Sequence, residues 1–130
     1  CTTDLLLEKM QIVEINLKDF KDTIVLLLEH DLGRPGAKNG KTIDTDYIVS
    51  LMASDWGFYY TFTTNLNRVK DHLDQFDTLP ESDKEVIRSR IDELINLIEA
   101  SPKSLKWKLR ATVGTKKIWY QEVSEKASQF

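Results

Sequence analysis

The chain contains few of the residues from which disulfides, metal sites and membrane spans are built. One cysteine excludes an intramolecular disulfide and a cysteine-based zinc cluster, and two histidines leave little room for a histidine-rich site. The longest apolar run, residues 24–28, is far shorter than the roughly 18 residues needed to cross a membrane. We therefore expect no metal, no cofactor and no membrane partner.

Glycine and proline are also scarce. Five glycines and three prolines exclude collagen-like and linker-like chains. With 130 residues, of which 41% are hydrophobic and 30% charged, the chain has the composition of one globular domain spanning 1–130. The single cysteine favours a reducing compartment, and we expect the cytoplasm. Helical patterning starts directly after Cys1, which disfavours a lipid anchor there, because such anchors precede a flexible spacer.

Apolar side chains recur at alternating steps of four and three near the start of the chain. The residues of this stripe are Leu6, Met10, Val13, Leu17, Phe20, Ile24 and Leu27. Such spacing keeps one side of a helix against a neighbour. Because Gly33 and Pro35 supply an end signal, the stripe predicts one helix over about residues 3–31.

This predicted helix is long for its domain. About 28 helical residues extend roughly 42 Å, whereas a compact chain of this length is roughly 36 Å across. The helix must therefore overhang its domain, bend, or break around residues 19–23. An overhanging apolar stripe needs a partner. We therefore expect a homo-oligomer, most simply a dimer, that associates through Leu6, Met10, Val13, Leu17 and Phe20.

Two further stripes predict helices in the middle of the chain. The first consists of Tyr59, Phe62, Leu66, Val69, Leu73 and Phe76. It predicts a helix up to about residue 76, although residues 56–64 also have the composition of a strand. A shorter helix over 44–53 precedes it, with a break near 54–57. The second stripe consists of Ile87, Ile91, Leu94 and Ile98. It predicts a helix that starts at a Ser82–Glu85 capping box and ends before Pro102.

After Pro102 the apolar period changes from 3.6 to 2. Trp107, Leu109, Ala111 and Val113 alternate with polar residues, and a Gly-Thr pair at 114–115 follows. This pattern predicts a β-hairpin with strands over about 105–113 and 117–122. The expected fold class is therefore mainly α (α+β), a three- or four-helix assembly with a C-terminal β-hairpin.

The charge distribution is uneven along the chain. Residues 1–100 hold 11 basic and 19 acidic side chains, whereas residues 101–120 have no acid. The cations of this second segment are Lys103, Lys106, Lys108, Arg110, Lys116 and Lys117. Next to Trp107 and Trp119, they form the type of surface that binds phosphates and stacks bases. The alternative is a solvated face whose lysines pair with the acidic helices of the same domain.

Two further features are weaker signs of a binding site. Residues 33–42 end in Gly-Lys-Thr, as phosphate-binding loops do, but the first glycine of that motif is displaced, which favours a turn. Trp56, Tyr60 and His72 are the residues that could line a small-molecule pocket. No catalytic constellation is evident, so we lean against an enzyme.

The features together favour an interaction protein. The first hypothesis is a non-enzymatic protein–protein interaction module that self-associates through its N-terminal amphipathic helix and binds another protein. The alternative is a nucleic-acid-binding accessory protein that uses the basic C-terminal hairpin.

Overall fold

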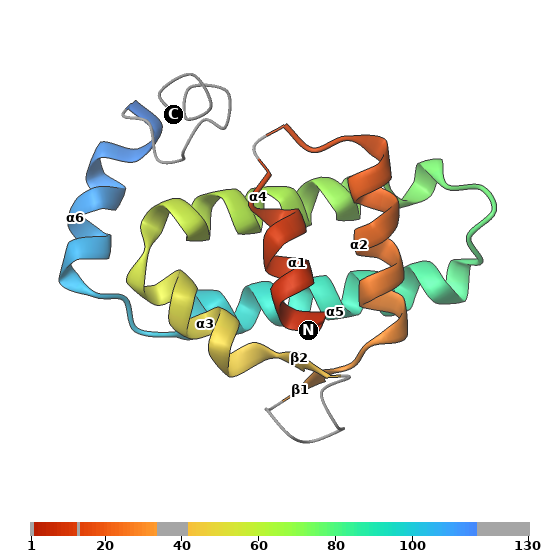
Figure 1. Ribbon diagram of the computed structural model, residues 1–130, viewed down its shortest axis with the longest axis horizontal. Helices are drawn as coiled ribbons and strands as arrows, with labels where there is room; N and C mark the ends of the chain where they lie inside the picture. Colours follow the sequence, from red (N-terminus) through yellow and green to blue (C-terminus); the bar gives the residue numbers. More distant parts are fainter. Residues whose placement is uncertain (1, 13, 34–41, 117–130) are drawn as a thin grey trace, which may run out of the picture.

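The computed structural model describes residues 2–12, 14–33 and 42–116, and these residues form a helical bundle (Figure 1). The elements are α1 (Thr2–Met10), α2 (Leu17–Glu29), β1 (Leu32–Gly33), β2 (Ile43–Asp44), α3 (Thr45–Ser54), α4 (Trp56–His72), η1 (Leu73–Gln75), α5 (Glu81–Ala100), α6 (Leu105–Val113) and η2 (Gly114–Lys116). Helices α4 and α5 run antiparallel along the long axis, and α1 and α2 cross them on one side. None of these helices is both long and apolar enough to span a membrane.

The continuous helix predicted over 3–31 is wrong, because the chain forms two helices, α1 and α2, separated by residues 11–16. Local chemistry starts the second helix. The Asn16 side chain accepts a hydrogen bond from the Asp19 amide (2.9 Å), and the Asp19 carboxylate accepts one from the Asn16 amide (3.3 Å). This reciprocal capping box satisfies two backbone donors at the start of α2.

A tertiary contact fixes the end of α1. Asn65 of α4 is almost completely buried, and its Nδ2 donates to the carbonyl oxygens of Met10 (2.8 Å) and Ile12 (2.7 Å). These carbonyls would otherwise lack partners at the helix terminus. The side-chain amide of Asn65 therefore stabilises the non-helical backbone between α1 and α2.

The predicted C-terminal hairpin is also wrong. Residues 105–113, expected to form its first strand, are the helix α6, and 117–122 lie outside the described residues. Ser104 caps this helix by accepting a hydrogen bond from the Trp107 amide at 3.1 Å. In the part of the chain that the structure describes, strands occur only as the parallel pair β1–β2, with Leu32 opposite Ile43 and Gly33 opposite Asp44.

The middle helices follow the predicted stripes. The expected break near residues 54–57 is confirmed at Asp55, whose carboxylate caps α4 by accepting from the Phe58 amide at 3.2 Å. Residues 56–64 are helical rather than a strand. The capping box expected at Ser82 is wrong, because α5 already begins at Glu81 after Pro80 and has no side-chain cap.

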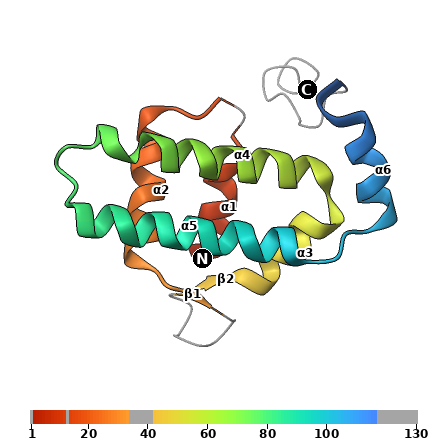
Figure 2. The ribbon, with the colours of Figure 1, turned by 180° about the vertical axis from the view of Figure 1, so that it is seen from behind.

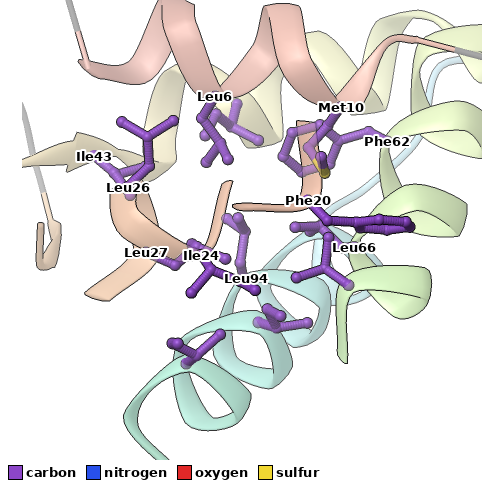
Figure 3. Packing of buried hydrophobic residues seen from close by; sticks show 14 of the residues in the cluster. Leu6, Met10, Phe20, Ile24, Leu26, Leu27, Ile43, Phe62, Leu66 and Leu94 are labelled. Atoms are coloured by element: carbon purple, nitrogen blue, oxygen red, sulfur yellow. The ribbon is translucent and has the colours of Figure 1, made fainter. Parts of the chain in front are cut away.

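The apolar stripes meet in one core between the crossing helix pairs (Figure 3). Its fully buried members include Leu6 and Met10 of α1, Leu27 of α2, Phe62 and Leu66 of α4, and Ile87, Ile91, Leu94 and Ile98 of α5. The core is therefore built by α1 to α5. Helix α6 contributes no buried residue to it and lies at one end of the molecule.

Candidate interaction surface on helix α6

Helix α6 has a tertiary hydrogen bond at its start and a local cap at its end. The Ser104 amide donates to the carbonyl oxygen of Ala53 in α3, at 3.2 Å. At the other end, Gly114 adopts a φ of 61°, a conformation that suits glycine, and its carbonyl oxygen accepts from the Arg110 guanidinium at 2.7 Å. The start of α6 is thus tied to the end of α3, whereas the Gly114 contact stabilises only the end of α6 itself.

The inner face of α6 rests on aromatic rings rather than on the core. The Trp107 ring meets Tyr59 of α4 edge-on, with ring centroids 5.1 Å apart. Arg110 lies over the Trp56 ring at 5.0 Å, and Trp56 stacks on Tyr60 at 5.1 Å. Contacts of this kind contribute about 0.5–1.5 kcal/mol each, so α6 is held by a few moderate interactions.

Two of the basic residues in this region serve the chain itself. Lys103 Nζ donates to the carbonyl oxygens of Ile98 (2.5 Å) and Ser101 (2.6 Å) at the end of α5, and it lies 5.6 Å from the Trp107 ring. Arg110 is engaged with Trp56 and Gly114. These two cations are therefore structural parts of the α5–α6 corner.

The outer face of α6 carries an exposed apolar ridge. Leu105 is 73% exposed and Leu109 62% exposed, which makes them the two most exposed large apolar side chains among the described residues, and Val113 is also exposed. The three residues are spaced by four and therefore lie on one side of the helix. We define Leu105, Leu109 and Val113 as the α6 ridge.

Lysines flank this ridge. Lys106 and Lys108 are exposed on either side of it, and Lys116 follows in η2. Within the described ranges, none of the three has a hydrogen-bonding or ion-pair partner. By contrast, Lys70 pairs with Asp92 at 2.7 Å, and Arg88 binds three carboxylates. The α6 ridge thus combines exposed apolar area with uncompensated positive charge.

A small cavity of about 260 Å³ lies beneath α6. Its walls include Asp55 and Trp56 at the start of α4, and Lys106, Trp107 and Arg110 of α6. The Trp107 indole N–H is buried and finds no acceptor among the described residues. Ligand pockets usually measure about 300–1,000 Å³, so this cavity is better explained by incomplete packing of α6 than by a ligand.

Tyr59, beneath α6, has a strongly perturbed hydroxyl. It donates to Glu99 Oε1 of α5 at 2.5 Å. Partial burial, the hydrogen bond and the charge of Glu99 together raise the pKa of Tyr59 to about 12. The neutral phenol is therefore favoured, and it joins α4 and α5 at the place where α6 packs.

The predicted pocket residues are not brought together. Trp56 and Tyr60 stack beneath α6, whereas His72 lies at the opposite end of α4, sixteen residues from Trp56 and therefore roughly 24 Å away. There His72 stacks on Phe20 with centroids 5.0 Å apart. These three residues therefore do not line one pocket.

The residues predicted for self-association lie mostly inside the molecule. Leu6, Met10 and Phe20 are buried in the core (Figure 3), and Val13 lies outside the described residues. Leu17 is 60% exposed. Since buried side chains cannot contact a second molecule without unfolding, a surface for association has to be sought elsewhere.

Of the predicted basic residues, Lys103, Lys106, Lys108, Arg110 and Lys116 lie on or beside α6, and Lys117 lies outside the described residues. The α6 ridge itself was not recognised from the sequence, although the spacing of Leu105, Leu109 and Val113 by four residues was its signal.

The described residues contain no metal-binding cluster, and the chain resembles no known family. In the described ranges, no three His, Cys, Asp or Glu side chains are grouped so as to hold a metal ion. The chain matches no protein-family model, and neither a curated protein nor a solved structure is significantly similar to it.

Proposed function

We propose that the protein is a non-enzymatic protein–protein interaction module and that α6 is its docking element. The observation that carries this proposal is the exposed ridge of Leu105 and Leu109, with lysines on both sides that have no ion-pair partner among the described residues. The partner surface that fits it is an apolar stripe bordered by carboxylates, as on an acidic amphipathic helix. We retain the cytoplasm as the proposed compartment because the chain has one cysteine.

The two parts of this surface have different roles in binding. Complete burial of a leucine side chain contributes about 1.5–3 kcal/mol, so Leu105 and Leu109 supply most of the affinity. Lys106 and Lys108 attract an acidic partner and set its orientation, which raises the association rate more than the affinity. A short helix is sufficient, because a few central side chains dominate most interfaces.

A designed peptide tests this proposal. The probe is a helical peptide with leucines spaced by four and glutamates on either side, and its binding is followed by tryptophan fluorescence. We expect L105A/L109A to weaken binding by at least about tenfold. The matched control is L17A, which removes another exposed leucine from α2. Equal binding by L105A/L109A and wild type would remove α6 as the docking element.

The nucleic-acid alternative is supported by the three unpaired lysines, Lys106, Lys108 and Lys116. It is disfavoured because Trp56 is buried against Tyr60 and Arg110 and Trp107 packs on Tyr59, so both rings are already engaged within the chain. Binding of labelled single-stranded DNA and RNA at low salt tests it. Salt-sensitive binding that is lost in K106E/K108E/K116E would favour this alternative.

A further inference from the structure

The outer face of α5 offers a surface complementary to the α6 ridge. An open, shallow strip of surface runs along this face from Glu85 to Ala100; among the described residues it is lined by α5 alone, and we call it the α5 trough. Small or short side chains, Ser89, Asn96 and Ala100, line it together with Leu97, which is partly exposed. Short side chains allow the backbone of another helix to approach closely.

The trough is acidic. Glu85, Asp92 and Glu93 contribute three carboxylates, against one guanidinium from Arg88. Asp92 binds Lys70 and Glu85 binds Arg88, whereas Glu93 has no partner in the described part of the chain. The trough therefore has the opposite sign to the α6 ridge, where the unpaired residues are lysines.

Helix α6 is short enough to lie along the trough. Residues 85–100 of α5 extend about 22 Å, and the nine residues of α6 extend about 13 Å. Among the described residues, α6 does not cover the trough of its own chain, because it packs against α3 and α4 beyond the end of α5 (Figure 2). The trough is therefore open to a helix from another molecule.

We infer that the partner of α6 is a second copy of this chain, whose α5 trough receives the α6 ridge. Leu105 and Leu109 then pack against Leu97 and Ala100, while Lys106 and Lys108 lie near Asp92 and Glu93. If each copy gives its α6 to the other, the two contacts are identical and the assembly closes as a two-fold dimer. This inference rests on the proposed function, since both use the same face of α6.

A competing surface for the second copy is the outer side of α2. Leu17 and Val25 are exposed there, but Lys18 and Lys21 are exposed beside them. Lysines of α6 would meet lysines of α2, and like charges in contact disfavour association. The acidic trough of α5 is thus the better match for α6.

Sedimentation of the full chain, with charge-reversal variants, tests the inference. We expect the wild type to dimerise at micromolar concentrations, and K106E/K108E and D92K/E93K each to raise the dimer dissociation constant by at least about tenfold. In an equimolar mixture of these two variants, the mixed dimer has one α6–α5 contact with reversed charges and one with wild-type charges, so it should associate more tightly than either variant alone. The control K18E/K21E, on α2, should dimerise like the wild type. Circular dichroism checks that every variant is folded.

The outcomes separate this inference from the proposed function. A wild type that remains monomeric at 100-fold higher concentration, or a dimer that K18E/K21E disrupts and K106E/K108E does not, overturns the dimer. If such a chain still binds the acidic leucine peptide through Leu105 and Leu109, the proposed function stands without it. If the peptide does not bind either, both fail. Binding of an oligonucleotide in place of a second copy would also overturn the dimer.

Discussion

Helices α1 to α5 and helix α6 are held by different physical means. The five helices share a core in which Phe62, Leu66 and Leu94 are fully buried. Helix α6 buries none of its side chains and is held by ring contacts, one cap and one backbone hydrogen bond to α3. The first region therefore derives its stability from apolar area removed from water, and the second from a few contacts near the surface.

The difference teaches where binding energy is available in this molecule. Apolar side chains in the core are already removed from water, so they cannot contribute further burial to a complex. Leu105 and Leu109 are exposed, and a partner can still bury them. Segments with few buried contacts also open at lower free-energy cost than the core. Helix α6 can therefore adjust to a partner without loss of the bundle.

The largest effect is expected in the core, where two phenylalanines on one helix make a matched pair. Phe62 is 0% exposed and Phe58, one turn earlier in α4, is 42% exposed. We expect F62A to lower the free energy of unfolding by about 3–5 kcal/mol, and F58A to lower it by less than about 1 kcal/mol. Urea denaturation measures both. Similar values for the two variants would contradict the described core.

The next effect concerns the break between α1 and α2. N65A leaves the carbonyl oxygens of Met10 and Ile12 without their donor, and we expect a loss of about 2 kcal/mol. The neighbouring N67A, at an exposed position, serves as control and should change stability by less than about 0.5 kcal/mol. If the two variants unfold at the same denaturant concentration, Asn65 does not fix this break.

A smaller effect on global stability is expected from W107A. This change removes the edge-on contact with Tyr59, and we expect amide hydrogens of 105–113 to exchange faster while those of α4 and α5 are unaffected. Hydrogen exchange with mass spectrometry measures each segment separately. The variant L109A, on the outer face, is the control and should leave exchange unchanged under monomeric conditions. Faster exchange throughout the bundle would show that α6 is part of the core unit.

The smallest effect appears only at alkaline pH. Because the folded chain raises the pKa of Tyr59 from 10.0 to about 12, the resulting stabilisation is complete below pH 10 and is lost as the pH rises through about 12. Tyrosinate absorbance of the wild type should therefore contain a component that ionises near pH 12, and Y59F should lose this component. In E99Q the pKa of Tyr59 should fall toward its ordinary value. A late titration that persists in Y59F would assign it to another tyrosine.

The sequence predicted α4 and α5 well because their apolar spacing and their burial agree. It did not predict the break at 11–16, since the steps of three and four continue across it and the deciding contact comes from Asn65, far away in the chain. The sequence contains only one local signal for this break: Asn16 is followed three residues later by Asp19, the spacing of a capping box.

The strand predicted over 105–113, where the structure has α6, was wrong for a geometric reason. Apolar residues at every second position from 105 to 113 fit the alternation of a strand. Every second member of this series also recurs after four residues, which is a helical spacing. The same residues therefore satisfy a helix with Leu105, Leu109 and Val113 on one side and Trp107 and Ala111 on the other. The charge of this candidate site was visible in the sequence. Its apolar ridge depended on recognising the helix.

The parallel pairing of β1 and β2 has a practical consequence for protein engineering. The Ile43 amide donates to the Asp31 carbonyl oxygen at 2.8 Å, and Leu32 lies opposite Ile43, so the described residues on either side of 34–41 are held next to each other. Extra sequence inserted between residues 34 and 41 lowers the free energy of unfolding mainly through the entropy of closing a longer loop. This cost is about 0.6 kcal/mol for each doubling of loop length. An epitope or a fluorescent reporter can therefore be inserted there while α6 and the α5 trough keep their native form.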